Sequence, residues 1–178
     1  PLRWHRPRRI FVCAHGDLFA EGVPDEWIDR VFAVMALCPQ HSFQVLTKRP
    51  ARMRAYLADR DAVTLRLEAP MEALHRSTGG RFGLSAYDLP FRDGPWPLPN
   101  VWLGTSVEDQ RRADERIPHL LQTPAEIRFI SAEPLLGALD LTNLSVGGLS
   151  WNALGRLAER EEELAYAMEQ LAVGADVM

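Results

Sequence analysis

The chain has 178 residues, of which 47% are hydrophobic and 25% charged, and its formal net charge is −4. Its length allows roughly two-thirds of the unfolded surface to be buried in one core, and its composition excludes global disorder. The acidic balance argues against nucleic acid as a partner, and no apolar run approaches the ~20 residues that cross a membrane. No signal-peptide pattern follows Pro1, so we expect a soluble, cytoplasmic protein without membrane contact.

Cysteine and lysine are both rare in this chain. Cys13 and Cys38 form no CxxC pair and have no histidine at zinc-ligand spacing, so we expect free thiols and no metal site. The 20 basic residues comprise 19 arginines and a single lysine, Lys48. A lysine ammonium is a compact charge with a shiftable pKa, which a guanidinium cannot replace. Lys48 is therefore a candidate functional residue, and codon bias toward arginine is the alternative explanation.

Four short apolar runs are continuous rather than alternating, which is typical of buried strands in a parallel sheet; they span residues 10–14, 43–47, 101–105 and 127–131. Helix signals follow the first three. Pro24 and Pro50 each stand at an expected helix start, and Ser106 with Asp109 has the spacing of a capping box. This alternation predicts an α/β fold of parallel βα units, most simply a partial (β/α) barrel. No GxGxxG motif follows any strand, so the dinucleotide-binding open sheet lacks its fingerprint.

We expect a βα-repeat domain over residues 1–149, and two regions of the chain depart from the strand–helix rhythm, one inside this domain and one after it. Residues 61–99 read as an irregular insertion with a possible helix over residues 65–75, because four prolines crowd its end. Residues 150–178 read as a C-terminal amphipathic helix, whose apolar positions are Leu154, Leu157, Leu164, Met168 and Leu171. This helix either packs on the sheet or binds a protein partner through residues 150–172.

Ligands of parallel α/β folds bind at the carboxyl ends of the strands, and all four predicted strands end in polar residues. We expect Lys48 and Glu133 to be catalytic, partly buried and close together in one pocket. The expected ligand-binding residues are Asp17, Arg49, Ser106, Glu108 and Ser131. Such an edge suits a polar or anionic ligand.

Three stretches of the chain carry a resemblance to a known family. They are RRIFVCAHGDLFAEGVPDEWIDRVFAVMALCPQHSFQVLTKRPARM, LPNVWLGTSVEDQRRADERIP and RFISAEPLLGALDL. Over roughly residues 1–145 the sequence resembles a phage- and mobile-element-associated family of unknown function, described as radical-SAM-like with a three-cysteine motif. The resemblance implies a partial or complete β/α barrel. It also implies S-adenosylmethionine and a [4Fe-4S] cluster held by a CxxxxxxCxxC-type motif.

This chain departs from that family in two places. Cys13 and Cys38 do not match the cysteine motif, and Gly147-Gly148 is followed by Leu149 where the family has glutamate. We therefore expect a truncated or remodelled member with a polar strand-end pocket and no iron–sulfur cluster of its own. The alternative is a non-catalytic binding or assembly module of a mobile element that acts through the C-terminal helix.

Overall fold

The computed structural model describes residues 1–79, 95–146 and 148–154. In chain order the elements are β1 (Arg9–Val12), α1 (Asp25–Ala36), β2 (Ser42–Thr47), α2 (Pro50–Leu57), α3 (Arg60–Ser77), β3 (Val101–Ser106), α4 (Gln110–Leu121), β4 (Ile127–Ser131), β5 (Leu144–Val146) and β6 (Leu149–Trp151). The four predicted strands and the strand–helix alternation are confirmed, with small shifts at the strand ends.

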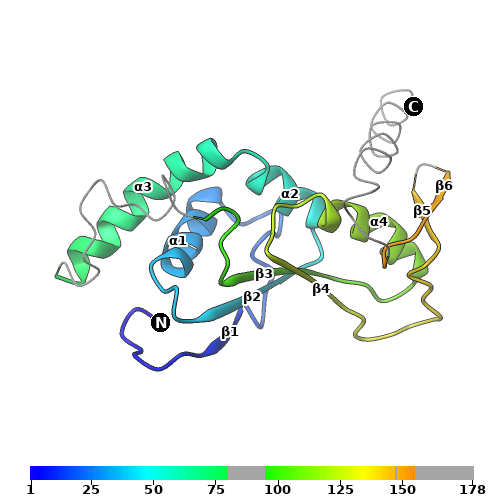
Figure 1. The fold of residues 1–178 in the computed structure, drawn as a ribbon, viewed down its shortest axis with the longest axis horizontal. Coiled ribbons are helices and arrows are strands. Elements are labelled where there is room, and N and C mark those ends of the chain that lie inside the picture. The colour runs from blue at the N-terminus through cyan, green and yellow to red at the C-terminus, as the bar shows by residue number, and fades with distance from the viewer. Residues whose placement is uncertain (80–94, 147, 155–178) are drawn as a thin grey trace.

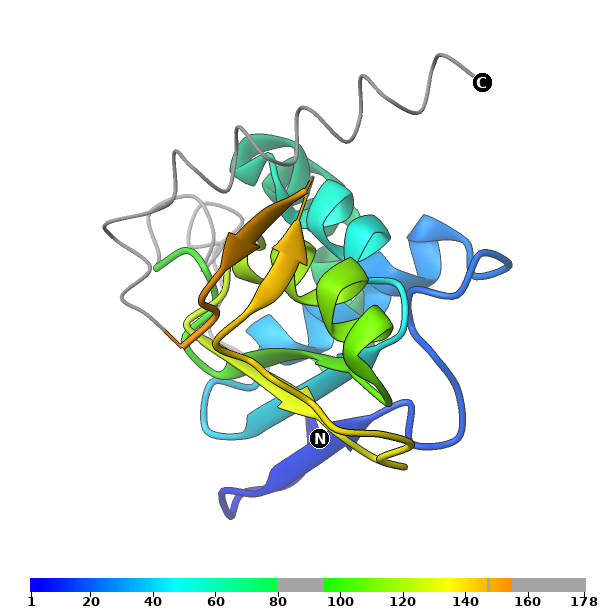
Figure 2. The same cartoon turned by 90° about the vertical axis from the view of Figure 1, so that its right-hand side faces the viewer.

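The first four strands form one sheet in the order β1-β2-β3-β4, and each neighbouring pair is parallel (Figure 1). Each connection moves one strand further in the same direction, so right-handed crossovers place their helices on the same face of the sheet. Figures 1 and 2 show α1, α2, α3 and α4 on that one side. Barrels of βα units use this winding, whereas a doubly wound sheet carries helices on both faces.

The hydrophobic core lies between the sheet and these helices. Its central side chains are almost completely inaccessible to solvent: Phe43, Val45, Val101 and Leu103 from the strands, and Ile28, Phe32, Met53 and Leu67 from the helices. A smaller cluster joins α4 to the β5–β6 hairpin through Ile117, Leu144 and Val146. The strand residues of the main core alternate with residues that point to the opposite face.

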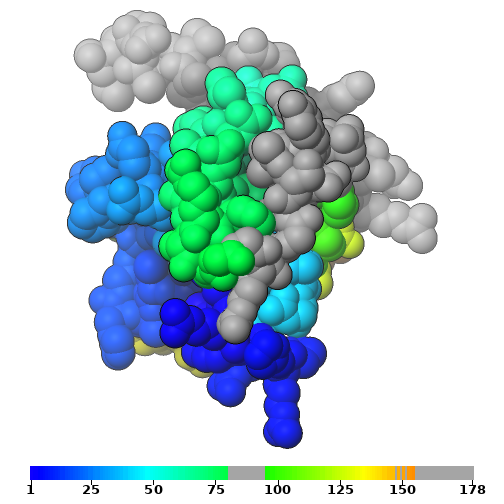
Figure 3. Space-filling view, turned by 90° about the vertical axis from the view of Figure 1, so that its left-hand side faces the viewer, coloured from blue at the N-terminus to red at the C-terminus, as the bar shows by residue number. Residues whose placement is uncertain are grey.

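The possible helix over residues 65–75 is confirmed and is longer than expected, so the first part of the predicted insertion at residues 61–99 is regular. Helix α3 has 18 residues and begins after Asp59, whose side chain accepts hydrogen bonds from the amides of Asp61 and Ala62. It buries Val63, Leu67 and Met71 in the core and lies beside α1 (Figure 3). Residues 80–94, the rest of the irregular stretch, lie outside the described residues.

The C-terminal part also differs from the expectation. Residues 144–151 contain an antiparallel hairpin, β5–β6, so no helix begins at Ser150. The predicted amphipathic helix and its expected partner surface fall mostly on residues 155–178, which lie outside the described residues. In the described part of the chain, no helix is long and apolar enough to cross a membrane.

Candidate functional site: a basic pocket at the carboxyl edge of the sheet

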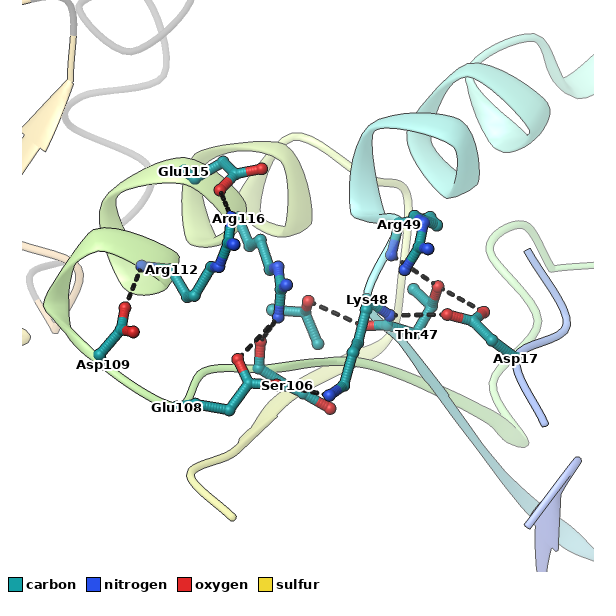
Figure 4. A network of polar contacts seen from close by, with 11 residues as sticks. Asp17, Thr47, Lys48, Arg49, Ser106, Glu108, Asp109, Arg112, Glu115 and Arg116 are labelled. Carbon is teal, nitrogen blue, oxygen red and sulfur yellow. Dashed lines mark hydrogen bonds and ion pairs between the residues drawn. The ribbon is translucent and has the colours of Figure 1, made fainter. Parts of the chain in front are cut away.

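Asp17 ties the loop after β1 to the end of β2 (Figure 4). Its Oδ1 accepts hydrogen bonds from the backbone amide of Phe19 at 2.9 Å and from the Thr47 hydroxyl at 2.7 Å. Its Oδ2 accepts from the backbone amide of Lys48 at 2.9 Å. The Thr47 hydroxyl oxygen in turn accepts from the Arg49 amide at 2.9 Å. Asp17 and Thr47 therefore fix the backbone from which the two exposed cations Lys48 and Arg49 project.

Lys48 forms an ion pair with Glu108 from the end of β3. The ammonium lies 2.7 Å from Oε1 of Glu108, and the Lys48 side chain remains 50% exposed. Oε2 of Glu108 lies 3.0 Å from a guanidinium nitrogen of Arg116, which also donates to the Ser106 carbonyl oxygen at 2.8 Å. Glu108 and Arg116 are each 8% exposed. One buried carboxylate thus joins a buried cation on α4 to an exposed cation after β2, as Figure 4 shows.

The charge state of Glu108 follows from these partners. The hydrogen bond from Lys48 lowers the pKa of Glu108 below its ordinary value, and the charge of Arg116 acts in the same direction. Burial opposes this effect without reversing it. Glu108 is therefore a fixed anion at neutral pH, and it holds Lys48 in place at the edge of the sheet.

The first turn of α2 presents an uncapped helix N-terminus. Pro50 starts the helix, and the N-cap residue Arg49 makes no side-chain capping bond. This turn contains no acidic residue that would neutralise the partial positive charge of the helix end. The amides of Ala51 and Arg52 have no acceptor within the helix, because an α-helix leaves its first N–H groups unpaired.

A pocket of about 260 Å³ lies between this helix end and α4. We call it the α2–α4 pocket; it is lined by Phe19, Glu21, Lys48, Arg49, Pro50, Ala51, Arg52, Glu115, Arg116 and His119. Four of these side chains are cationic and two are carboxylates. Arg52 is held by Asp25 and by the Val23 carbonyl oxygen, both at 2.6 Å, so it fastens the β1–α1 loop against α2.

Two buried nitrogen atoms in the pocket wall have no hydrogen-bond partner among the described residues. They are Nε of Arg116 and Nδ1 of His119. Burial lowers the pKa of His119, and the nearby charge of Arg54 adds to this, while Glu115 acts in the opposite direction. His119 is therefore neutral near pH 7. Both nitrogen atoms are closed off from solvent, and Nδ1 of the neutral His119 ring donates or accepts according to its tautomer.

The structure brings together most of the predicted site residues: Asp17, Lys48, Arg49, Ser106 and Glu108 belong to one network. Ser106 contributes its carbonyl oxygen, and Asp109 rather than Ser106 is the N-cap of α4, which corrects the capping box. Ser131 ends β4 at the same edge, where its carbonyl oxygen accepts from the Val107 amide at 2.9 Å.

Glu133 does not occupy the expected position. Glu133 and Lys48 are both exposed, so the predicted partial burial of this pair is wrong, and the carboxylate that meets Lys48 is Glu108. The catalytic roles expected for Lys48 and Glu133 stay predictions. Sequence reasoning missed Arg52, Arg116 and His119, because it searched strand ends and these residues lie on helices. The available signal was the three-residue spacing of Arg116 and His119, which places both on one face of α4.

The thiols of this chain do not fit an iron–sulfur cluster. Cys13 is exposed after β1, whereas Cys38 is completely buried beyond the end of α1. Burial raises the pKa of both thiols, and Asp17 adds to the effect at Cys13, which disfavours the thiolate that a cluster needs. Across residues 1–79, 95–146 and 148–154, no three or more His, Cys, Asp or Glu residues are grouped to hold a metal ion.

Comparison with known protein families gives a match over most of the chain. Residues 1–166 match a family with the description "Protein of unknown function (DUF5131)". No curated protein and no solved structure matches the chain. The matched range includes every strand of the parallel sheet and every residue that lines the α2–α4 pocket.

Proposed function

The chain belongs to the DUF5131 family, whose description assigns no activity, and from that premise we propose that it binds a small anionic ligand in the α2–α4 pocket. One observation carries the proposal: the uncapped N-terminus of α2 opens into a pocket lined by four cationic side chains. Helix N-termini bind anions through their free amides and their partial positive charge. A phosphate or carboxylate group has the acceptor oxygens that such a site needs.

The residues divide into ligand-contacting and positioning groups. Lys48 and Arg49 are exposed cations at the mouth of the pocket and would contact the anion. Asp17 and Glu108 position Lys48. Asp17 accepts a hydrogen bond from the Lys48 backbone amide, and Glu108 pairs with the Lys48 ammonium. Buried Arg116 adds a positive charge to the pocket wall.

The resemblance to radical-SAM-like proteins enters this proposal only as ancestry. We propose that the strand-end pocket is the retained part of such a site and that a mobile element is its biological setting. Two separated thiols do not supply the thiolate set of a cluster. The proposal therefore assigns no cluster, and no step that uses S-adenosylmethionine, to these residues.

Calorimetric titration with inorganic phosphate at constant ionic strength tests the proposal. Lys48→Met and Arg49→Met each remove one charged donor, and such a hydrogen bond contributes about 1.5–3 kcal/mol, so the Kd should rise about tenfold or more in each variant. Arg111→Met is the matched control, because Arg111 is an exposed arginine on α4 outside the pocket. It should bind phosphate like the parent.

Two results would contradict the proposal. One is a parent protein that gives no saturable heat with phosphate or with acetate, which presents a carboxylate. The other is equal weakening in all three variants, because that pattern indicates diffuse charge attraction rather than a site.

A further inference from the structure

One face of the sheet lies opposite the helices, and Figures 1 and 2 show no helix of the described residues on that side. A row of side chains crosses this face, according to the strand register: Phe11 on β1, Gln44 on β2, Trp102 on β3 and Ile127 on β4. Phe11 is 45% exposed, and Gln44 and Trp102 are partly exposed. The row therefore presents two aromatic rings with an amide side chain between them.

Arginine side chains lie against tryptophan rings in this part of the molecule. Arg9 shares its face of β1 with Phe11, because alternate residues of a strand point the same way, and its guanidinium lies 5.7 Å from the Trp102 ring centre. In the segment before β1, the Arg8 guanidinium lies 4.7 Å from the ring centre of Trp4, which is 42% exposed. The surface thus carries two stacks of a flat cation on an aromatic ring.

Charge is distributed unevenly along the chain, so the net charge of −4 does not describe this surface. Residues 1–16 contain no acidic residue and four arginines, all of them exposed: Arg3, Arg6, Arg8 and Arg9. Among the described residues, no carboxylate forms an ion pair with any of these four. None of the strands β1, β2, β3 and β4 contains an aspartate or a glutamate. These cations are therefore free to pair with the phosphates of a polyanion.

We propose that this surface binds single-stranded nucleic acid, with bases stacked on Trp4, Phe11 and Trp102 and phosphates held by the arginines of residues 3–9. Unpaired bases stack on aromatic rings of an exposed sheet face and on guanidinium planes, and they hydrogen-bond through their free edges. Gln44 provides an amide for such bonds between the two rings of the sheet. An anionic membrane would also attract arginine and tryptophan, but a polar amide at the centre of the row favours bases over acyl chains.

Fluorescence anisotropy of a labelled oligothymidylate of about 16 nucleotides, titrated with the full chain, tests the proposal. Arg9→Gln should weaken binding and reduce the slope of log K against log salt by about 0.7, the value for one phosphate contact on a single strand. Trp4→Leu should raise the Kd about fivefold or more, because one stacking ring is lost. Arg30→Gln and Trp27→Leu are the matched controls, since both residues are exposed on α1, and both variants should bind like the parent.

Phe11→Leu tests the sheet face itself, because it removes the ring and keeps an apolar side chain. It should also raise the Kd about fivefold or more. Far-UV circular dichroism checks that each variant remains folded, and the exposed positions of Arg9 and Trp4 keep the test independent of the Phe11 variant. An oligouridylate measured in parallel shows whether RNA or DNA binds more tightly.

Four results would overturn the proposal. The first is no saturable binding of either oligonucleotide up to about 100 μM, the weak end of non-specific binding. The second is a duplex of the same length that binds as tightly as the single strand, because its bases are not free to stack. The third is equal weakening by Arg9→Gln and Arg30→Gln, which indicates diffuse charge attraction. The fourth is binding to phosphatidylglycerol vesicles without binding to oligonucleotides, which identifies a membrane surface as the partner.

Discussion

Glu108 pairs with two cations, buried Arg116 and exposed Lys48. This difference in burial sets how much stability the protein loses when either ion pair is broken. Arg116 is 8% exposed, so Glu108→Gln would leave a buried charge uncompensated and lower the free energy of unfolding by about 3 kcal/mol. The Lys48 side chain is 50% exposed, so Lys48→Met should cost less than ~1 kcal/mol. Urea unfolding of both variants at pH 7 measures the contrast. Equal losses would show that Arg116 does not depend on Glu108.

The pH dependence of stability provides the control for this prediction. The folded-state pKa of Glu108 lies below its ordinary value of 4.5, so the unfolded chain binds more protons in the window below that value. The stability that Glu108 contributes is therefore complete above pH 4.5 and is lost as the pH falls through the lowered pKa. The difference between the parent and Glu108→Gln should shrink over the same window.

The strand-end rule found Lys48 and Glu108 but not their pairing. Glu108 and Glu133 both follow strands that end at the same edge, and the sequence offers no reason to prefer either as the partner of Lys48. Strand order decides the choice. β3 is the neighbour of β2, while β4 is one strand further away, so a residue that follows β3 is better placed to meet Lys48 than one that follows β4.

Three helices are joined by a polar cluster that periodicity did not reveal. The Tyr56 hydroxyl on α2 donates to Asp29 on α1 at 2.6 Å, and the Arg66 guanidinium on α3 lies 4.5 Å from the Tyr56 ring centre. Burial raises the pKa of Tyr56, and the hydrogen bond to Asp29 acts in the same direction, so the hydroxyl remains a donor. This cluster fixes α1, α2 and α3 relative to one another above the sheet.

Tyr56→Phe removes the donor and leaves the buried Asp29 carboxylate with one fewer partner. We expect the free energy of unfolding to fall by about 1–3 kcal/mol. A double-mutant cycle with Asp29→Ala measures the coupling between the two side chains. Additive losses would show that the hydrogen bond contributes nothing beyond the packing of the ring.

At the scale of elements, the sequence predicted those parts whose signals are local. Proline at the start of α2 and continuous apolar strands are such signals, and the corresponding elements are present. Helix α3 was only partly predicted, because Pro70 inside it and its weak apolar stripe obscured a clear N-cap at Asp59. The β5–β6 strands have three residues each, and their pairing depends on packing against α4, which no local pattern encodes.

At the scale of the molecule, continuous apolar strands predicted a sheet covered on both faces. Phe11, Leu46 and Trp102 give the strands this character, yet the described residues cover only the face toward the helices. Strand order explains the difference, because four strands wound in one direction place every crossover helix on one side. The apolar composition of the strands thus indicated a second buried face, but no sequence pattern indicated which residues cover it.

Hydrogen exchange can test whether another strand pairs with the outer edges of the sheet. The backbone amides of β2 and β3 should exchange slowly because both strands pair on two sides, whereas outward amides of β1 and β4 should exchange faster. Mass spectrometry of peptides from each strand of the full chain measures the contrast. A further strand at either edge would pair the outward amides there, so protection of β1 or β4 as strong as that of β2 and β3 would contradict two unpaired edges among the described strands.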